Sequence, residues 1–213
     1  MGCSRQDLTL YAVTDRSWLK GERLASVVEQ AIQGGATCIQ LREKELKGEE
    51  LLQEAEEVKE ICKKYGVPLI INDDVELALR IDADGVHVGQ KDMAAKEARK
   101  RLGADKILGV TAKTVEQALQ AQEQGADYLG SGAVFGSKSK ADAKKLDHEI
   151  LRQICEAVEI PVLAIGGIDQ ANVSQLAGTG ICGVAVISGI FARPDIRDAA
   201  EELKKKTMEM LEG

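Results

Sequence analysis

The sequence predicts an α/β fold, a single (β/α)8 TIM barrel, and three observations indicate it. Short apolar runs alternate along the whole chain with longer stretches whose apolar residues recur at helical spacing. Glycine often stands before the next apolar run, as in "GGAT" and "GICG", where a helix should end. Distinctive polar groups follow the apolar runs, and such barrels collect their active sites at the carboxyl ends of the strands.

Eight apolar runs are the predicted strands. In order, they are "LTLYAV" (8–13), "TCIQL" (37–41), "VPLII" (67–71), "GVHV" (85–88), "KILGV" (106–110), "DYLG" (127–130), "PVLAI" (161–165) and "GVAVIS" (183–188). Each precedes a stretch with helical spacing, such as "GEELLQEAEEVKEICKKYG". A doubly wound open sheet is the alternative, but its first turn is usually Gly-rich, whereas the first turn here reads "TDRSWLKG". No low-complexity linker interrupts the pattern, so we expect residues 1–213 to form one domain.

The composition suits a soluble globular protein, with 44% hydrophobic and 30% charged residues in 213. A net charge of −7 argues against general binding to nucleic acid or to an anionic membrane. No apolar stretch approaches the ~20 residues of a membrane span, and the N-terminus lacks the apolar core of a signal peptide. The five cysteines form no CxxC pair, which argues against a disulfide framework and predicts a reduced, cytoplasmic location.

The stretch "TCIQLREK" (37–44) begins as a buried strand and ends with polar side chains at alternate positions. Residues two apart in a strand point the same way, so Gln40, Arg42 and Lys44 would converge. Such a trio suits a multiply charged anion, because Arg binds it as a fork and Lys as a point charge. A solvated charged strand end is the alternative interpretation.

Carboxylates follow the next two predicted strands. "IINDD" places Asn72, Asp73 and Asp74 after the third strand, and "GVHVGQKD" places Asp92 after the fourth. Two carboxylates beside an anion site favour Mg²⁺, which takes one or two carboxylates together with substrate phosphate oxygens. Helix capping is the alternative for each aspartate. We predict Asp73 and Asp92 as metal ligands and Asp74 as the better cap.

A second anion site is indicated by "AIGGI" (164–168) and "VAVISG" (184–189), since the last two loops of these barrels often bind phosphate. Plain tight turns are the alternative. The long loop "GSGAVFGSKSKADAKK" suits a lid on which Ser137, Ser139 and Lys140 bind anions, or else a solvated loop. We interpret His87 and His148 as structural. Without a Ser–His or Cys–His pair, the chemistry would depend on charge neutralisation and positioning.

These motifs occur in the order found in the thiamine-phosphate synthase family, and the chain resembles that family from about residue 8 to 195. The resemblance rests on "LYAVTD", "QLREK", "INDD", "GVHVGQKD", the Ser-Lys-Ser-Lys loop, "AIGGI" and "VAVIS". It implies a transferase that joins 4-amino-2-methyl-5-hydroxymethylpyrimidine diphosphate to 4-methyl-5-(2-hydroxyethyl)thiazole phosphate. Thiamine phosphate and diphosphate are the products, and the cofactor is Mg²⁺. The family's proposed route is dissociative.

The resemblance also implies roles for individual residues. The pyrimidine diphosphate would contact Gln40, Leu41, Arg42, Glu43, Lys44, Asn72, Thr111 and Lys140. Of these, Arg42, Lys44 and Lys140 would be catalytic. The thiazole phosphate would contact Ser137, Lys138, Ser139, Gly167, Ile187 and Ser188, with Asp73 and Asp92 on Mg²⁺. The chain departs from the family at Thr111, where Ser is usual, at the two loop serines, where Thr is usual, and at Lys113, where His is common.

Two other functions compete with this interpretation. A thiazole tautomerase-like relative would share the barrel but lack many of the residues that bind diphosphate and metal. The present sequence has those residues. A non-catalytic protein that binds thiamine precursors would bind both ligands without releasing diphosphate. The predicted partners are therefore two small phosphorylated molecules, with neither nucleic acid nor membrane, and assembly into a homo-oligomer stays open.

Overall fold

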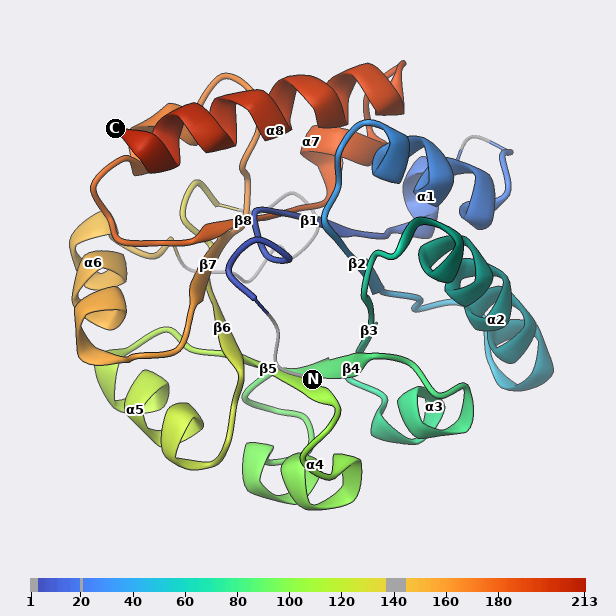
Figure 1. Cartoon of the computed structure of the whole chain (residues 1–213), viewed down its shortest axis with the longest axis horizontal. Helices are drawn as coiled ribbons and strands as arrows, with labels where there is room; N and C mark the ends of the chain where they lie inside the picture. Colours follow the sequence, from blue (N-terminus) through green and yellow to red (C-terminus); the bar gives the residue numbers. More distant parts are fainter. Residues whose placement is uncertain (1–3, 20, 137–144) are drawn as a thin grey trace.

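The computed structural model describes residues 4–19, 21–136 and 145–213. Eight parallel strands form a closed barrel in sequence order, with β8 beside β1, which confirms the predicted fold class (Figure 1). The strands are β1 (Leu10–Val13), β2 (Cys38–Leu41), β3 (Leu69–Asn72), β4 (Gly85–Val88), β5 (Ile107–Thr111), β6 (Tyr128–Gly132), β7 (Val162–Ile165) and β8 (Gly183–Val186). Each predicted strand overlaps an observed strand, and the ends of the two differ by at most two residues.

Helices surround the barrel (Figure 1). They are α1 (Leu24–Gln33), α2 (Gly48–Tyr65), α3 (Val75–Arg80), α4 (Ala95–Leu102), α5 (Val115–Glu123), α6 (His148–Ala157), α7 (Ser188–Phe191) and α8 (Ile196–Glu212), with 3₁₀ helices η1 (Arg16–Trp18) and η2 (Val173–Leu176). The expected α-helix after β7 is wrong, because η2 stands there instead. Gly178 and Gly180 follow it with positive φ, which stops a helix from continuing.

Alternation along the strands divides the buried residues into two layers. On β2, Ile39 and Leu41 belong to the large apolar layer between the strands and the outer helices. Cys38 points the other way, into the barrel, where it joins an inner cluster that includes Tyr11 and Tyr128. The inner cluster packs inside the barrel, and such barrels carry their active sites above it, at the carboxyl ends of the strands.

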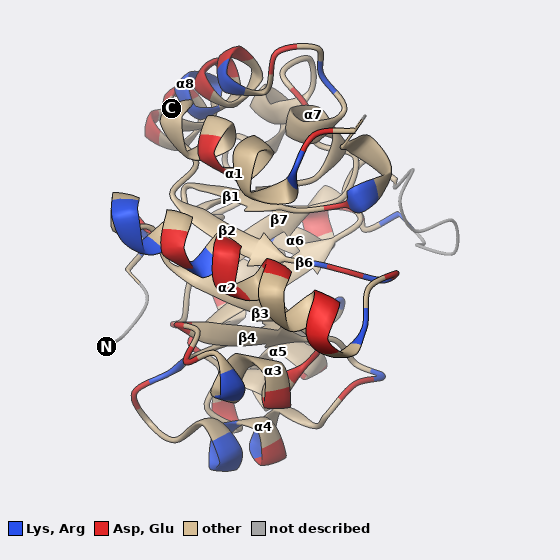
Figure 2. Cartoon of the chain, turned by 90° about the vertical axis from the view of Figure 1, so that its right-hand side faces the viewer, with Lys and Arg blue, Asp and Glu red and all other residues tan. Residues whose placement is uncertain are grey.

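Both signs of charge are spread over the outer helices. Acidic and basic residues occur together on α2, α3 and α4 (Figure 2). Among the residues that the structure describes, no helix is long and apolar enough to cross a membrane. The assignment of residues 1–213 to one domain stays a prediction.

Candidate active site

A cavity of about 410 Å³ opens at the carboxyl ends of the strands. Its lining draws residues from all eight strands or the loops that follow them. Nine residues predicted from the sequence are among them: Gln40, Arg42, Asn72, Asp73, Asp92, Thr111, Gly167, Ile187 and Ser188. Residues separated by almost 150 positions in the sequence are therefore brought to one cavity, as the barrel topology predicts.

The cationic part of the site follows β2. Arg42 lines the cavity, and its Nη1 donates to Asp15 Oδ2 at 3.0 Å. Its Nε is buried and has no hydrogen-bond partner within the described residues. Lys44 is more exposed, and its Nζ lies 3.0 Å from Asp73 Oδ2. Arg42 therefore contacts the cavity directly, whereas Lys44 lies beside it, against the Asp73 carboxylate.

Asp73 and Asp92 form a pair of neighbouring carboxylates. Asp73 has a φ of 65°, an uncommon conformation that turns the chain directly after β3, and Asn72 Nδ2 donates to its Oδ1 at 2.7 Å. Asp92 Oδ2 accepts from the Gly89 N–H at 2.8 Å. Partial desolvation raises the pKa of Asp92, as does the adjacent Asp73 carboxylate, while the Gly89 N–H and Lys44 oppose the rise.

This carboxylate pair fits a divalent cation. Two negative groups held together repel each other, and a cation between them would remove that cost. Groups of three or more His, Cys, Asp or Glu side chains that could hold a metal are absent from the described residues. A pair of carboxylates suits Mg²⁺, which commonly completes its shell with waters and substrate phosphates.

The alternative interpretation as helix caps separates the three aspartates. Asp74 is the N-cap of α3, where its side chain accepts from the Leu77 N–H at 2.9 Å, so the cap prediction is confirmed. Helix α4 has Ala94 as its N-cap residue, and the Asp92 carboxylate accepts from the Gly89 N–H instead, so Asp92 is not a cap of that helix. Asp73 lies before the cap of α3 and points to the site.

The β7–β8 side of the cavity is built differently, from glycines and apolar side chains. Gly166 and Gly167 follow β7 with φ values of 99° and 70°. A Cβ on Gly167 would lie 2.7 Å from the Gly136 carbonyl oxygen and 2.9 Å from that of Phe135. The pair thus packs closely against the loop after β6, and only glycine suits both the φ and the space.

A chain of polar side chains crosses the barrel beneath the cavity, and the sequence interpretation missed it. Gln40 Nε2 donates to the Tyr11 hydroxyl at 2.8 Å, which lies 2.8 Å from the Tyr128 hydroxyl. Tyr128 continues to His87 Nδ1 at 3.1 Å, and His87 Nε2 lies 2.9 Å from Thr111 Oγ1. His87 therefore lines the cavity as well as supporting the barrel.

The sequence did contain one signal for these hydrogen-bonded side chains, namely glycines that lie opposite the aromatic rings. A Cβ on Gly109 would lie 2.2 Å from Tyr128 Cζ and 2.5 Å from His87 Nδ1. Gly130 leaves similar space for the ring, because a Cβ on Gly130 would lie 3.0 Å from His87 Cε1. Glycine inside a strand often marks a place where another group approaches closely.

Three of the predicted residues that the structure describes do not line the cavity. Lys44 is one of them, and it reaches the site only through its ion pair with Asp73. Leu41 is 2% exposed and packs in the outer apolar layer, on the opposite face of β2 from Gln40. Glu43 has a side chain that is 2% exposed, and its carboxylate binds Arg16 and backbone N–H groups. The predicted contacts of Ser137, Lys138, Ser139 and Lys140, and the lid, lie outside the described residues.

A closed eight-stranded barrel whose cavity lies at the carboxyl ends of its strands and is lined by a cation and a carboxylate pair is the architecture of a TIM-barrel enzyme. Comparison with known proteins identifies the family. A family model described as thiamine monophosphate synthase matches residues 10–190. The chain therefore belongs to the thiamine-phosphate synthase family, and the predicted membership is confirmed.

Individual relatives cover almost the whole chain. The thiamine-phosphate synthase of Clostridium tetani is 53% identical over 197 residues, which are 92% of this chain and 94% of that protein. The thiamine-phosphate synthase of Ruminiclostridium cellulolyticum is 51% identical over 200 residues, 94% of this chain and 95% of the relative. A solved thiamine phosphate pyrophosphorylase from Pyrococcus furiosus has a TM-score of 0.89 at 40% identity, covering 97% of this chain and 98% of its own.

Proposed function

We propose that this enzyme joins 4-amino-2-methyl-5-hydroxymethylpyrimidine diphosphate to 4-methyl-5-(2-hydroxyethyl)thiazole phosphate and releases diphosphate and thiamine phosphate. The observation that carries the proposal is that Arg42 lines the same cavity as the Asp73–Asp92 pair, while Lys44 contacts Asp73. Cations beside paired carboxylates suit a magnesium diphosphate better than a monophosphate. Membership in the family supports the same substrates.

Each group at the β2–β4 side takes a part in holding the diphosphate. Arg42 would bind it with the free edge of its guanidinium, and Lys44 would add a point charge at the rim. Gln40, Asn72 and Thr111 would orient the substrate by hydrogen bonds from the cavity wall. Gly167, Ile187 and Ser188 line the opposite side, where the thiazole phosphate would bind.

Asp73 and Asp92 would hold Mg²⁺. When bound, the ion supplies positive charge that neutralises the diphosphate as a leaving group. Asn72 supports this arrangement because its side-chain amide orients the Asp73 carboxylate. Lys44, which contacts Asp73, lies beside the same position.

The residues present suit a dissociative route. The C–O bond to diphosphate breaks with its electron pair on the leaving oxygen, which Arg42 and Lys44 neutralise. The pyrimidine-methyl cation is stabilised by its ring amino group, and the lone pair of the thiazole nitrogen then forms the C–N bond. That nitrogen carries no proton, so no general base is required.

Apolar side chains on the β1 and β6–β8 sides would protect the cation from water. Val13 on β1, Leu163 and Ile165 on β7, and Ala185 on β8 all line the cavity. A wall of this kind excludes water from a reactive intermediate. Capture by the thiazole nitrogen is thereby favoured over capture by water.

Three further expectations accompany the proposed activity. We expect the enzyme to act in the cytoplasm on small molecules, independently of nucleic acid and membrane. We also expect residues 1–213 to form one domain. Assembly into a homo-oligomer stays a prediction.

The test is diphosphate release measured with both substrates, with and without Mg²⁺, and with each substrate omitted in turn. The expected result is release that needs both substrates and the metal and that equals the thiamine phosphate formed. Tight binding of the thiazole phosphate without any release would contradict the proposal and favour a tautomerase-like relative. Binding of both substrates without turnover would instead indicate a non-catalytic binding protein.

A further inference from the structure

Three consecutive residues after β1 hold the beginning of the β2–α2 loop. Thr14 is fully buried, and its Oγ1 accepts from the Arg42 N–H at 2.9 Å and donates to the Arg42 carbonyl oxygen at 3.2 Å. The Thr14 N–H also donates to the Gln40 carbonyl oxygen at 3.0 Å. The backbone of Arg42 is thus fixed on both sides by one threonine.

Asp15 holds the side chain of the same arginine. Its Oδ2 accepts from Arg42 Nη1 at 3.0 Å, and its Oδ1 accepts from the Ser17 N–H at 3.1 Å and from Ser17 Oγ at 2.6 Å. The side chains of Asp15 and Arg42 are 15% and 13% exposed, so water screens the pair only partly. One carboxylate therefore caps η1 and orients a guanidinium at the same time.

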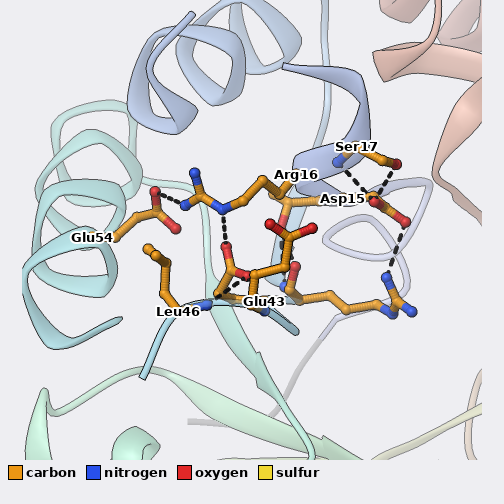
Figure 3. Close-up of polar contacts among 9 residues, drawn as sticks. Asp15, Arg16, Ser17, Glu43, Leu46 and Glu54 are labelled. Atoms are coloured by element: carbon orange, nitrogen blue, oxygen red, sulfur yellow. Dashed lines mark hydrogen bonds and ion pairs between the residues drawn. The ribbon is translucent and has the colours of Figure 1, made fainter. Parts of the chain in front are cut away.

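Arg16 extends the connection to the loop and to α2. Its Nε donates to Glu43 Oε2 at 2.7 Å, and its Nη2 donates to Glu54 Oε1 (Figure 3). Glu43 Oε1 accepts from the backbone N–H groups of Glu45 at 2.6 Å and of Leu46 at 3.2 Å. Figure 3 shows Arg16 between the two glutamates, with Asp15 and Ser17 beside it.

The charges of Glu43 and Arg16 are favoured by their contacts, whereas burial raises the pKa of Glu54. Burial acts to raise the pKa of Glu43, but hydrogen bonds from the Glu45 N–H and from Arg16 outweigh it, so that pKa is lowered. The pKa of Arg16 is raised, chiefly by its hydrogen bond to Glu54. Glu43 thus remains an anion that ties Arg16 to the loop carrying Arg42 and Lys44.

We propose that Asp15 is a positioning residue for Arg42, which it aims into the cavity to receive a diphosphate. This inference rests on the proposed function, since that assigns the diphosphate to Arg42. Asp15 occupies Nη1, while the buried Nε has no partner within the described residues, so that the rest of the fork is left for an anion in the cavity. Thr14 and Arg16 fix the backbone on which this geometry depends.

The physical gain is preorganisation. A long arginine side chain loses rotamer entropy when it is fixed, and a fork that is already oriented loses less when it binds. An oriented fork also favours two parallel hydrogen bonds to a diphosphate over a single one. Asp15 would therefore affect the binding of diphosphate and leave the thiazole phosphate side unaffected.

Asp15→Ser is the sharpest test, because serine is as good a helix cap as aspartate but is too short to reach Arg42. The probe is inorganic diphosphate with Mg²⁺, measured by titration calorimetry on the full chain. We expect Asp15→Ser to weaken binding about tenfold, slightly less than the loss of one charged hydrogen bond would cost, because the guanidinium itself remains. Asp15→Asn should do the same, since it offers one acceptor oxygen where Arg42 and Ser17 need two.

Asp195→Ser is the matched control. Asp195 caps α8 by accepting from the Asp198 N–H at 2.9 Å, as Asp15 caps η1, and it does not line the cavity. Its substitution should leave diphosphate binding unchanged. In the proposed reaction, Asp15→Ser should raise KM for the pyrimidine diphosphate and leave KM for the thiazole phosphate unaltered.

A double-mutant cycle with Arg42→Gln separates this inference from the proposed function. If Asp15 acts through Arg42, Asp15→Ser has no further effect once Arg42 is replaced. Weaker binding in Arg42→Gln but unchanged or tighter binding in Asp15→Ser would overturn the positioning role alone. Unchanged binding in Arg42→Gln would overturn the proposed role of Arg42 itself.

Discussion

The β2–β4 side of the cavity and the β6–β8 side differ in the groups that they present. On the first side, charged side chains converge, namely Arg42, Lys44, Asp73 and Asp92. On the second, Gly166 and Gly167 adopt positive φ and pack against the loop after β6, beside apolar side chains. The first side is built from side-chain charge, and the second from backbone shape.

Under the proposed function, this difference would let one barrel distinguish two phosphorylated ligands. Charged side chains that are already oriented, together with a cation, suit a leaving group whose charge changes during the reaction. A closely packed glycine turn offers backbone groups that stay fixed, which suits a phosphate that is only held. The two sides should therefore respond to substitution in different ways.

Asp73→Asn should have the largest effect and should act on the charged side alone. It removes half of the carboxylate pair, and we expect turnover to fall at least ~100-fold, since loss of a mere outer-shell partner of a metal ligand costs about 10–100-fold. The measurement is the rate of diphosphate release as a function of Mg²⁺ concentration.

Asp74→Asn is the control for this substitution, because Asp74 is the adjacent carboxylate and caps α3 instead of facing the site. It should leave the Mg²⁺ dependence as it is. An unchanged rate and Mg²⁺ dependence in Asp73→Asn would contradict its assignment as a ligand.

Gly167→Ala should have the next largest effect and should act on the backbone side. The new Cβ would meet two carbonyl oxygens within 3 Å, and the φ of 70° disfavours alanine. We expect a loss of about 2 kcal/mol of unfolding free energy and a rise of about tenfold in KM for the thiazole phosphate. Denaturant unfolding and steady-state kinetics measure the two effects.

Gly178→Ala separates strain from crowding in that experiment. Gly178 has a φ of 73° but no atom within 4 Å of a Cβ, and it lies outside the cavity lining. Gly178→Ala should lower the unfolding free energy by only ~1 kcal/mol, the cost of the backbone strain that the alanine adds, and both KM values should stay unchanged. If Gly167→Ala raised KM for the pyrimidine diphosphate instead, the division between the two sides would be wrong.

The same division explains what could be predicted from the sequence. Strands and their order followed from apolar periodicity, and Arg42 and Asp73 were recognisable because charge at a strand end is a property of residue type. Leu41 and Glu43 were assigned through their place in "QLREK", but strand alternation turns Leu41 outward, and Arg16 holds Glu43. The contacts of Gly167 with the loop after β6 depend on tertiary structure, which a single sequence does not contain.

The polar chain under the cavity escaped prediction for a related reason. Tyr11 and Tyr128 stand in apolar runs and are buried, so they resemble ordinary core residues. Only the closed barrel brings β1 and β6 close enough for their hydroxyls to meet at 2.8 Å.

Tyr128→Phe should have an intermediate effect on the unfolding free energy, and it should affect both sides of the cavity. The Tyr128 hydroxyl joins Tyr11 to His87 across the barrel. Removing a buried hydroxyl with two partners should cost about 1–3 kcal/mol of unfolding free energy. Tyr65→Phe is the control, since Tyr65 is exposed and its loss should stay within about 0.5 kcal/mol. If Tyr128→Phe lowered the unfolding free energy no more than Tyr65→Phe does, the hydrogen bonds of the Tyr128 hydroxyl would add nothing to stability.

Lys113→Ala should have the smallest effect and tests where the charged side ends. Lys113 lines the cavity from the β5 loop but is exposed, so its attraction for a diphosphate is screened by water and salt. We expect KM for the pyrimidine diphosphate to rise about threefold at low ionic strength and to match the unmodified enzyme near 0.5 M salt, where the Debye length is only about 4–5 Å. Lys100→Ala, on the exposed face of α4, should change neither value. A loss of more than about tenfold that persists in high salt would show that Lys113 contacts the diphosphate directly, and the charged side would then extend from β2 to β5.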